Sequence, residues 1–188
     1  MVKKNFYKNK RILVTGATGF KGAWLCMWLK ILGSKVYGIG HNPNKNKNLF
    51  YSLNLHKEIN LSILDVRNFS KLCKKIKNIK PEIIFHLAAQ PLILESYKKP
   101  FETYNVNSNG TLNILESIKN TKSVKTLILV TSDKCYQEDN NVKFYKENSN
   151  LGGSEPYSSS KACAEIIAKS YTNNYQILKK KIITLRAG

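Results

Sequence analysis

A tyrosine and a lysine lie four residues apart in the segment Tyr157-Ser158-Ser159-Ser160-Lys161. On a helix, residues at i and i+4 share one face, so the ammonium group can lie beside the phenol. A neighbouring cation favours the phenolate and brings a pKa that is ordinarily about 10 towards neutrality. Such a tyrosine can take the proton of a hydroxyl group. The spacing occurs often by chance, but after a buried strand it predicts a proton-transfer site.

Three glycines follow a short apolar run near the amino terminus, in the segment Gly16-Ala17-Thr18-Gly19-Phe20-Lys21-Gly22. In a dinucleotide-binding turn the first glycine permits the tight turn, the second the approach to pyrophosphate, and the third the packing of helix on strand. The helix N-terminus then offers free N–H groups and a positive dipole to the phosphates. Three glycines also occur in ordinary loops, but the strand before and the helix after favour a dinucleotide site. A nicotinamide bound there could accept the hydride when the tyrosine deprotonates an alcohol.

The acidic residue that usually binds the adenosine ribose, about 20 residues further on, is missing. Asn42 lies in that region, and Glu58 is the first acidic residue of the chain. An acid there would repel a 2′-phosphate, so its absence leaves NADP possible beside NAD, with Asn42, Lys45 or Lys47 as contacts. The two lysines could equally be solvated loop charges. Asp65 could receive the adenine amino group, or it could be an acid at the start of a helix.

Apolar runs and segments of helical periodicity alternate in βαβα order, which predicts a parallel sheet covered by helices on both faces. The expected strands are residues 11–15, 35–39, 59–61, 82–86, 125–131 and 181–185. The expected helices are residues 20–32, 68–79, 101–120 and 157–171, with Gly33 as a C-terminal cap and Asn68 as an N-cap. We therefore predict a doubly wound, Rossmann-type α/β fold in which residues 1–188 form one dinucleotide-binding domain.

The chain carries 31 basic and 12 acidic residues, for a net charge of +19. Such a charge attracts polyanions weakly and in a salt-sensitive way. The lysines are spread along the whole chain, and they do not alternate with aromatic residues as a nucleic-acid stacking platform would require. We therefore expect no specific nucleic-acid binding.

The cysteines and histidines are scattered, which predicts reduced, buried thiols and no metal site. The cysteines are Cys26, Cys73, Cys135 and Cys163. No run of 18 apolar residues occurs and the amino terminus does not resemble a signal peptide, so we expect no membrane association and a cytoplasmic location.

Five motifs, in this order and over nearly the whole chain, resemble those of the extended short-chain dehydrogenase/reductase family. They are Gly16-x-x-Gly19-x-x-Gly22, His86-Leu87-Ala88-Ala89, Asn105-x-Asn107-x-x-Gly110-Thr111, Thr131-Ser132-Asp133-Lys134 and Tyr157-x-x-x-Lys161. Three stretches are further similar to the branch of sugar-nucleotide 4,6-dehydratases that act on CDP-glucose. They are Thr18-Gly19-Phe20-Lys21-Gly22, Ala88-Ala89-Gln90-Pro91-Leu92 and Thr131-Ser132-Asp133-Lys134-Cys135-Tyr136.

The resemblance implies a lyase of nucleotide-sugar metabolism, including that of lipopolysaccharide O-antigens. It would use NAD to oxidise the sugar at C4, eliminate water across C5 and C6, and return the hydride to C6. By resemblance, Tyr157 is the base for the C4 hydroxyl, and Lys161 tunes it and holds the nicotinamide ribose. Ser132 orients the substrate hydroxyl, and Asp133 protonates the departing C6 oxygen.

The resemblance also assigns binding residues. The implied substrate contacts are Gln90, Ser132 and Asn107. The implied cofactor contacts are Gly16, Thr18, Gly19, Phe20, Lys21, Gly22, Asn42, Asp65, Val66, Leu87, Ala88, Ala89, Tyr157 and Lys161.

Lys134 departs from the pattern of the dTDP-glucose dehydratases, which have a glutamate at this position that is expected to remove the C5 proton. A lysine could do so only if desolvation or a cationic neighbour lowered its pKa substantially. Lys134 could equally be a structural residue or a contact to the substrate phosphates. The residue that removes the C5 proton therefore stays open.

By resemblance, a smaller substrate domain would follow the last expected strand, and here it is missing. We therefore expect a dehydratase that needs a completing part, such as a complementing carboxy-terminal chain. The alternatives are a non-catalytic dinucleotide-binding remnant and a nucleotide-sugar epimerase. The uncovered face should expose apolar surface, which predicts poor solubility or a partner. The resemblance also implies a homodimer through helices 101–120 and 157–171.

Overall fold

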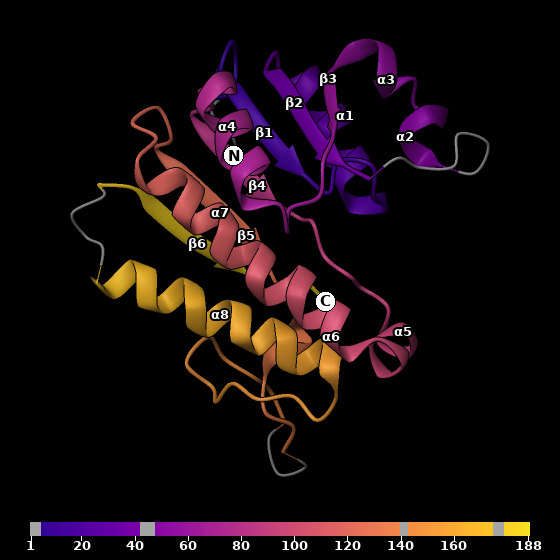
Figure 1. Cartoon of the computed structure of the whole chain (residues 1–188), viewed down its shortest axis with the longest axis vertical. Helices are drawn as coiled ribbons and strands as arrows, with labels where there is room; N and C mark the ends of the chain where they lie inside the picture. Colours follow the sequence, from indigo (N-terminus) through magenta and orange to yellow (C-terminus); the bar gives the residue numbers. More distant parts are fainter. Residues whose placement is uncertain (1–4, 42–47, 140–142, 175–178) are drawn as a thin grey trace.

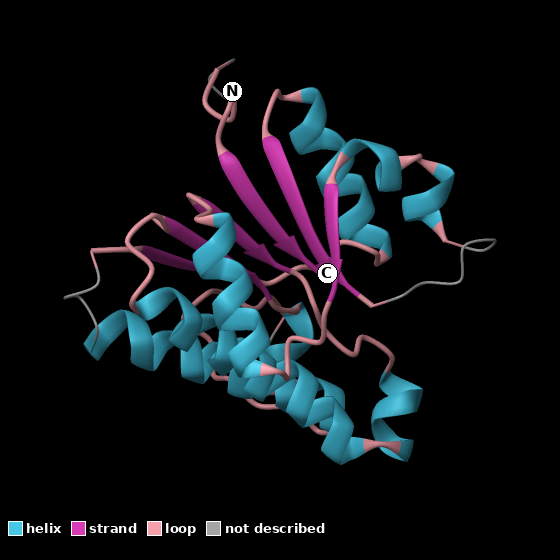
Figure 2. Ribbon diagram, turned by 45° about the horizontal axis from the view of Figure 1, so that its top comes forward, coloured by secondary structure: helices cyan, strands magenta, loops and turns pink. Residues whose placement is uncertain are grey.

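The computed structural model describes residues 5–41, 48–139, 143–174 and 179–188, and the strands in these ranges form one parallel sheet of six strands (Figures 1 and 2). The strands are β1 (Arg11–Thr15), β2 (Lys35–Gly40), β3 (Asn60–Ile63), β4 (Ile83–His86), β5 (Thr126–Val130) and β6 (Lys181–Leu185). Their order in the sheet is β3-β2-β1-β4-β5-β6. The doubly wound α/β fold predicted from the sequence is thereby confirmed.

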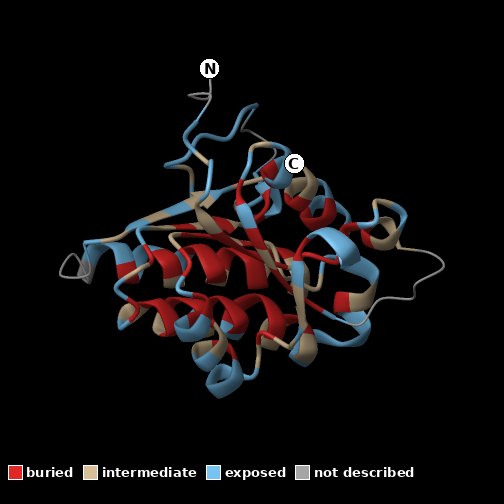
Figure 3. Cartoon of the chain, turned by 90° about the horizontal axis from the view of Figure 1, so that it is seen from above, coloured by how far each residue is buried: buried red, intermediate tan, exposed pale blue. Residues whose placement is uncertain are grey.

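Helices cover both faces of the sheet (Figure 1). The helices are α1 (Phe20–Ile31), α2 (Leu49–Ser52), α3 (Leu55–Glu58), α4 (Phe69–Ile79), α5 (Ile93–Lys98), α6 (Pro100–Tyr104), α7 (Gly110–Lys119) and α8 (Pro156–Asn174). Helices α4, α7 and α8 lie on one face, and α1 lies on the other with α2 and α3 against it. Figure 3 shows buried residues on the helix sides that face the sheet.

The central strand β1 shows why the sequence forms this core. Leu13 pairs with Tyr37 of β2 and Ile84 of β4, so both edges of β1 are hydrogen-bonded. Successive side chains of a strand point to opposite faces. Leu13 therefore joins the core cluster under α4, α7 and α8, while Ile12 and Val14 join the cluster under α1. A strand buried on both faces must be apolar throughout, which explains the continuous run.

The predicted elements agree with the structure to within a few residues at their ends. The expected caps are present: Gly33 has a φ of +80°, and the Asn68 side chain accepts a hydrogen bond of 3.1 Å from the Lys71 N–H. The expected helix over residues 101–120 is interrupted, because a π-helical turn over Asn105–Asn109 separates α6 from α7. The short helices α2, α3 and α5 were not predicted, since four to six residues are too few to show helical periodicity.

Apolar side chains remain exposed on the side of the sheet that carries α1. Trp24 and Trp28 of α1 are 48% and 52% exposed, and Leu185 of β6 is 49% exposed. On the opposite face, Thr184 of β6 bonds to α8. The expected apolar face that a further domain would cover, with its consequences for solubility and partners, stays a prediction.

Two of the four thiols are placed as expected. Cys26 and Cys135 are buried, whereas Cys73 and Cys163 are only half-buried; all four are free thiols. Burial raises the pKa of Cys26 to about 12 and that of Cys135 to about 11, so both stay protonated at neutral pH. None of the helices in the described ranges has the length and apolar character needed to cross a bilayer.

Candidate functional site

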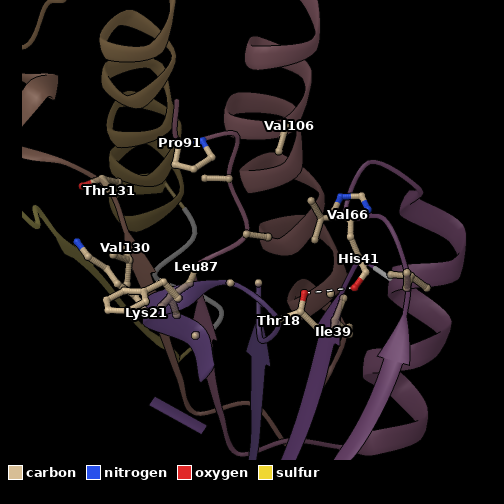
Figure 4. A pocket seen from close by; sticks show the side chains of 18 of the residues that line it. Thr18, Lys21, Ile39, His41, Val66, Leu87, Pro91, Val106, Val130 and Thr131 are labelled. Atoms are coloured by element: carbon tan, nitrogen blue, oxygen red, sulfur yellow. Dashed lines mark hydrogen bonds between the residues drawn. The ribbon is translucent and has the colours of Figure 1, made fainter. Parts of the chain in front are cut away.

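A cavity of about 550 Å³ opens at the carboxyl ends of β1, β2, β4 and β5 (Figure 4). Chain order reverses in the sheet between β1 and β4, which is where doubly wound folds bind their ligands. The described lining contains no carboxylate. The lining residues are Gly16, Thr18, Gly19, Phe20, Lys21, Gly22, Ile39, Gly40, His41, Asn48, Leu64, Val66, Leu87, Ala88, Ala89, Pro91, Val106, Val130, Thr131, Tyr157 and Lys161.

The glycine turn at the base of this cavity leaves no room for side chains. Gly16 has a φ of +71°, and a Cβ atom there would lie 2.7 Å from the backbone nitrogen of Ala88. A Cβ on Gly22 would lie 2.1 Å from the carbonyl oxygen of Gly16. Gly19, the N-cap of α1, has no side chain to bond the free N–H groups of the first turn. These N–H groups and the helix dipole favour an anion at this place, and binding of a pyrophosphate there stays a prediction.

The far end of the cavity, beside β2 and β3, is lined by apolar and polar groups. The Thr18 hydroxyl donates to the carbonyl oxygen of His41 over 3.3 Å, and the Asn48 amide donates to the carbonyl oxygen of Thr18 over 3.0 Å. Leu64 and Val66, which follow β3, also line the cavity. The sequence did not single out His41 or Asn48, because a lone polar residue in a loop carries no spacing signal.

Two predicted cofactor contacts are not among the lining residues. Asn42 lies outside the described residues, as do Lys45 and Lys47. The Asp65 carboxylate forms an ion pair with Arg67 (Oδ2 to Nη2, 2.6 Å) and accepts the Arg67 backbone N–H. The Arg67 side-chain hydrogen bond lowers the pKa of Asp65. Contact between Asp65 and adenine stays a prediction.

Tyr157 and Lys161 line the same cavity from the first two turns of α8. Glu155 fixes the start of this helix, because its carboxylate accepts the backbone N–H groups of Tyr157 (2.6 Å) and Ser158 (2.8 Å). The Tyr157 N–H also lies 3.2 Å from the Ser96 hydroxyl oxygen. A capping acid before a proline at the helix start is a recognisable signal, and it was missed in Glu155-Pro156.

The Lys161 ammonium is buried at the end of β5. Lys161 is 6% exposed, and its Nζ donates to the carbonyl oxygen of Val130 over 3.4 Å. Burial, and next the positive charge of Lys21, lower the pKa of Lys161 to about 8. At neutral pH Lys161 is therefore mainly charged, as a lysine that stabilises a phenolate must be.

Ser132, Asp133 and Lys134 follow Thr131 at the end of β5, but they do not appear in the cavity lining. Ser132 is 5% exposed; its hydroxyl donates to Asp133 Oδ1 over 3.1 Å and accepts the Lys134 N–H. Asp133 and Lys134 are exposed, on a 3₁₀ turn. Their side chains are accessible to a ligand beside the cavity, and their catalytic roles stay predictions.

The two other predicted substrate contacts are bonded to each other. Asn107 is 2% exposed; it accepts the Gln90 N–H (2.8 Å) and donates to the Gln90 carbonyl and to the Ser160 hydroxyl. The Gln90 amide nitrogen donates to Thr103 over 2.9 Å. In this structure both amides hold the loop after β4 in place, and neither lines the cavity. Direct contact with a substrate stays a prediction.

His86 ends β4 and is buried behind the cavity, whereas the following residues Leu87 to Ala89 line it. The His86 Nδ1 and Thr15 Oγ1 atoms are 2.7 Å apart. Burial, and next the charge of Lys161, lower the pKa of His86 to about 3. The imidazole is therefore neutral near pH 7.

A protein-family model described as GDP-mannose 4,6 dehydratase matches residues 13–186. The chain belongs to this family. The CDP-glucose 4,6-dehydratase of Salmonella typhimurium is 44% identical, with 100% of this chain and 54% of the relative aligned. The dTDP-D-glucose 4,6-dehydratase of Dictyostelium discoideum is 32% identical, over 95% of this chain and 43% of that protein. These dehydratases confirm the resemblance to the extended short-chain dehydrogenases/reductases.

Solved structures agree with the fold. The UDP-glucose 4-epimerase of Thermus thermophilus in complex with NAD superposes with a TM-score of 0.79 at 26% identity, over 94% of this chain and 54% of that one. The chain therefore spans about half the length of the dehydratases and epimerases that it matches.

Proposed function

We propose that this chain binds NAD and carries the oxidation and proton-transfer half of a nucleotide-sugar 4,6-dehydratase acting on CDP-glucose. One observation carries the proposal: Tyr157 and Lys161 line the same cavity as the glycine turn. The 44% identity to a CDP-glucose 4,6-dehydratase supports the choice of substrate.

The cavity fits a dinucleotide on three counts. First, the glycine turn forms a cradle that Cβ atoms at Gly16 and Gly22 would fill. Second, the N-terminus of α1 offers N–H groups to a pyrophosphate. Third, the described lining contains Lys21 and Lys161 and no carboxylate. NAD rather than NADP is supported by the NAD complex of the Thermus thermophilus epimerase. Bound here, the nicotinamide would supply a hydride acceptor for C4 of the sugar and a hydride donor for C6.

Different side chains carry out the separate proton transfers of the reaction. Tyr157 takes the proton of the C4 hydroxyl, and Lys161 stabilises the phenolate. Loss of the C5 proton and of the C6 oxygen completes the elimination of water, with Asp133 as the acid that protonates the leaving oxygen. Lys134 is exposed beside Asp133. It could accept the C5 proton only in its neutral form, so we leave the base unassigned.

Completion of the substrate site by further residues follows from the length comparison. Because the chain spans about half of each relative, a large part of each relative lies beyond the aligned region. We propose that residues corresponding to that part complete the site for the nucleotide and the sugar. The second candidate, dinucleotide binding without catalysis, is favoured by the absence of residues 132–134 from the described lining.

The test is to incubate the chain with NAD and CDP-glucose and to follow the sugar nucleotide by mass spectrometry. The expected product has lost one water and carries a 4-keto group, and Tyr157→Phe should abolish it. Tyr51→Phe, on α2, serves as the matched control. Tight NAD binding without product in wild type supports the second candidate. Inversion at C4 without loss of water would indicate an epimerase, and no affinity for either dinucleotide would refute both candidates.

A further inference from the structure

Glu165 is a carboxylate buried on α8, one turn beyond Lys161. It is 4% exposed. Its Oε1 accepts the Thr131 hydroxyl, and its Oε2 accepts the Thr184 hydroxyl and the Arg186 Nη2, each over 3.0 Å. A buried carboxylate is tolerated only when it is paired and fully hydrogen-bonded. All three partners come from the ends of β5 and β6, so Glu165 ties α8 to both strand ends.

These strand ends lead into the segment that bears the predicted acid. Thr131 lines the cofactor cavity and directly precedes Ser132 and Asp133. The Thr131 N–H donates to the Leu185 carbonyl over 2.8 Å, and the Asp133 N–H donates to the Ala187 carbonyl over 3.2 Å. The segment over residues 131–133 is therefore held by the backbone after β6.

Arg186 is fixed in turn by several contacts. Its guanidinium carbon lies 4.8 Å from the centre of the Tyr136 ring, and its Nη1 donates to the Glu147 carbonyl over 2.9 Å. The guanidinium therefore cannot move without breaking its pair with Glu165, and the backbone that binds Asp133 is fixed with it.

We propose that Glu165 is a positioning residue that holds the segment Thr131-Ser132-Asp133 in register with Tyr157 and Lys161. The two groups of residues lie on different elements, a strand end and a helix. Glu165 shares the helix with the Tyr–Lys pair and bonds directly to Thr131. The positional claim stands on these contacts, whereas its importance for turnover rests on the proposed function.

A purely stabilising role would predict a different outcome from a positioning role. We would compare Glu165→Gln, Thr131→Val and Thr131→Ser by the backbone ¹H–¹⁵N signals of Ser132 and Asp133 in the NAD-bound chain. Glu165→Gln and Thr131→Val should shift both signals in the same direction, and the double variant should shift them no further. Thr131→Ser, which keeps the hydroxyl, should restore the wild-type positions. The control is Glu58→Gln, at the exposed Lys30–Glu58 pair, which should leave both signals unchanged.

Unchanged Ser132 and Asp133 signals in a folded Glu165→Gln variant would overturn the proposal, and so would additive shifts in the double variant. If Glu165→Gln does not fold, the two Thr131 variants test the proposal instead, because both keep the ion pair between Glu165 and Arg186. Failure of Thr131→Ser to restore the signals would then count against it.

Turnover of CDP-glucose gives a second readout. A misplaced acid should lower kcat by about 100-fold in Glu165→Gln while KM changes little, since ångström-scale misplacement has effects of that order. Unchanged kcat would contradict the proposal. If the wild-type chain shows no turnover, the proposed function fails, and the amide signals still decide the role of Glu165.

Discussion

The Nζ atom of Lys161 donates a hydrogen bond of 3.4 Å to the carbonyl oxygen of Val130, the last residue of β5. This contact brings a buried cation on α8 to the strand that borders the cavity. The cation lies where the proposed chemistry needs positive charge, and burial makes it unfavourable for the fold.

Lys161→Met should therefore stabilise the protein while it weakens NAD binding. Methionine fills similar volume without a buried charge, so we expect the free energy of unfolding at pH 7 to rise by about 1–2 kcal/mol. Lys161→Met would also remove the proposed hydrogen bond from the ammonium group to the cofactor, which should weaken NAD binding by at least about tenfold. Urea denaturation and calorimetric titration measure the two effects, and a destabilised variant that binds NAD normally would contradict this account.

The cost of burying the Lys161 charge should also be visible in how the free energy of unfolding depends on pH. With a pKa near 8 in the folded chain and a higher one when unfolded, Lys161 binds fewer protons in the folded state between these values. The unfolding free energy should thus rise with pH above about 8 in the wild type. In Lys161→Met this rise should be smaller. Urea denaturation at pH 7.5 and pH 9.5 compares the two proteins.

Two glycines of the turn should respond differently to alanine. A Cβ at Gly22 would lie 2.1 Å from the Gly16 carbonyl oxygen, whereas one at Gly19 would lie 3.3 Å from the same atom. We expect Gly22→Ala to lower the unfolding free energy by about 2 kcal/mol or more. Gly19→Ala should remain nearly as stable and lose dinucleotide affinity, because its new methyl group would obstruct the pyrophosphate. Thermal melts and NAD titration separate the two, and equal destabilisation would disprove the distinction.

His86 should make the protein sensitive to acid. Its pKa of about 3 in the folded state lies below that of an unfolded histidine, so the unfolded chain binds more protons between pH 3 and about 6.5. Stability is therefore lost as pH falls through this window. In His86→Asn the loss between pH 7 and pH 4.5 should be smaller by about 2 kcal/mol. The exposed His56→Asn is the control, and identical pH dependence of His86→Asn and wild type would refute the assignment.

Asp65 offers a test of adenine recognition. We assume that the Asp65 carboxylate accepts a hydrogen bond from the adenine amino group in addition to its bond from Arg67. The hypoxanthine analogue of NAD lacks this amino group, so the wild type should bind NAD about tenfold more tightly than the analogue. In Asp65→Asn this preference should disappear while affinity for the analogue changes little. Competition titrations with the two dinucleotides give the ratio. A preference that survives the substitution would leave Asp65 as the partner of Arg67 only.

The strands and the glycine turn could be predicted because their signals are local. Ile12, Leu13 and Val14 form an apolar run that is typical of a doubly covered strand, and Gly16 and Gly22 lie at a spacing that the turn requires. The π-helical turn at Asn105–Asn109 could not be predicted, because helical periodicity on both sides hides one extra residue in a turn.

The surroundings of the site depended on contacts between distant residues. Ser96 meets Tyr157 across 61 positions, and Thr131 meets Glu165 across 34. No pattern within a window of sequence encodes such pairs. Asn107 illustrates the consequence: its motif predicted a substrate contact, and only the fold shows that its amide bonds to Gln90 and Ser160.

By itself the sequence determined the order of strands and helices, the place of the glycine turn, and the tyrosine and lysine on one helical face, because each follows from backbone sterics and residue periodicity. Only the tertiary structure decided which of these groups share a cavity. The tertiary structure also lowers the pKa values of Lys161 and His86, and it places the Glu165 carboxylate where it bonds α8 to the ends of β5 and β6. Burial and long-range hydrogen bonds exist only once the sheet and helices have packed, and so charge and position at the site are set by packing.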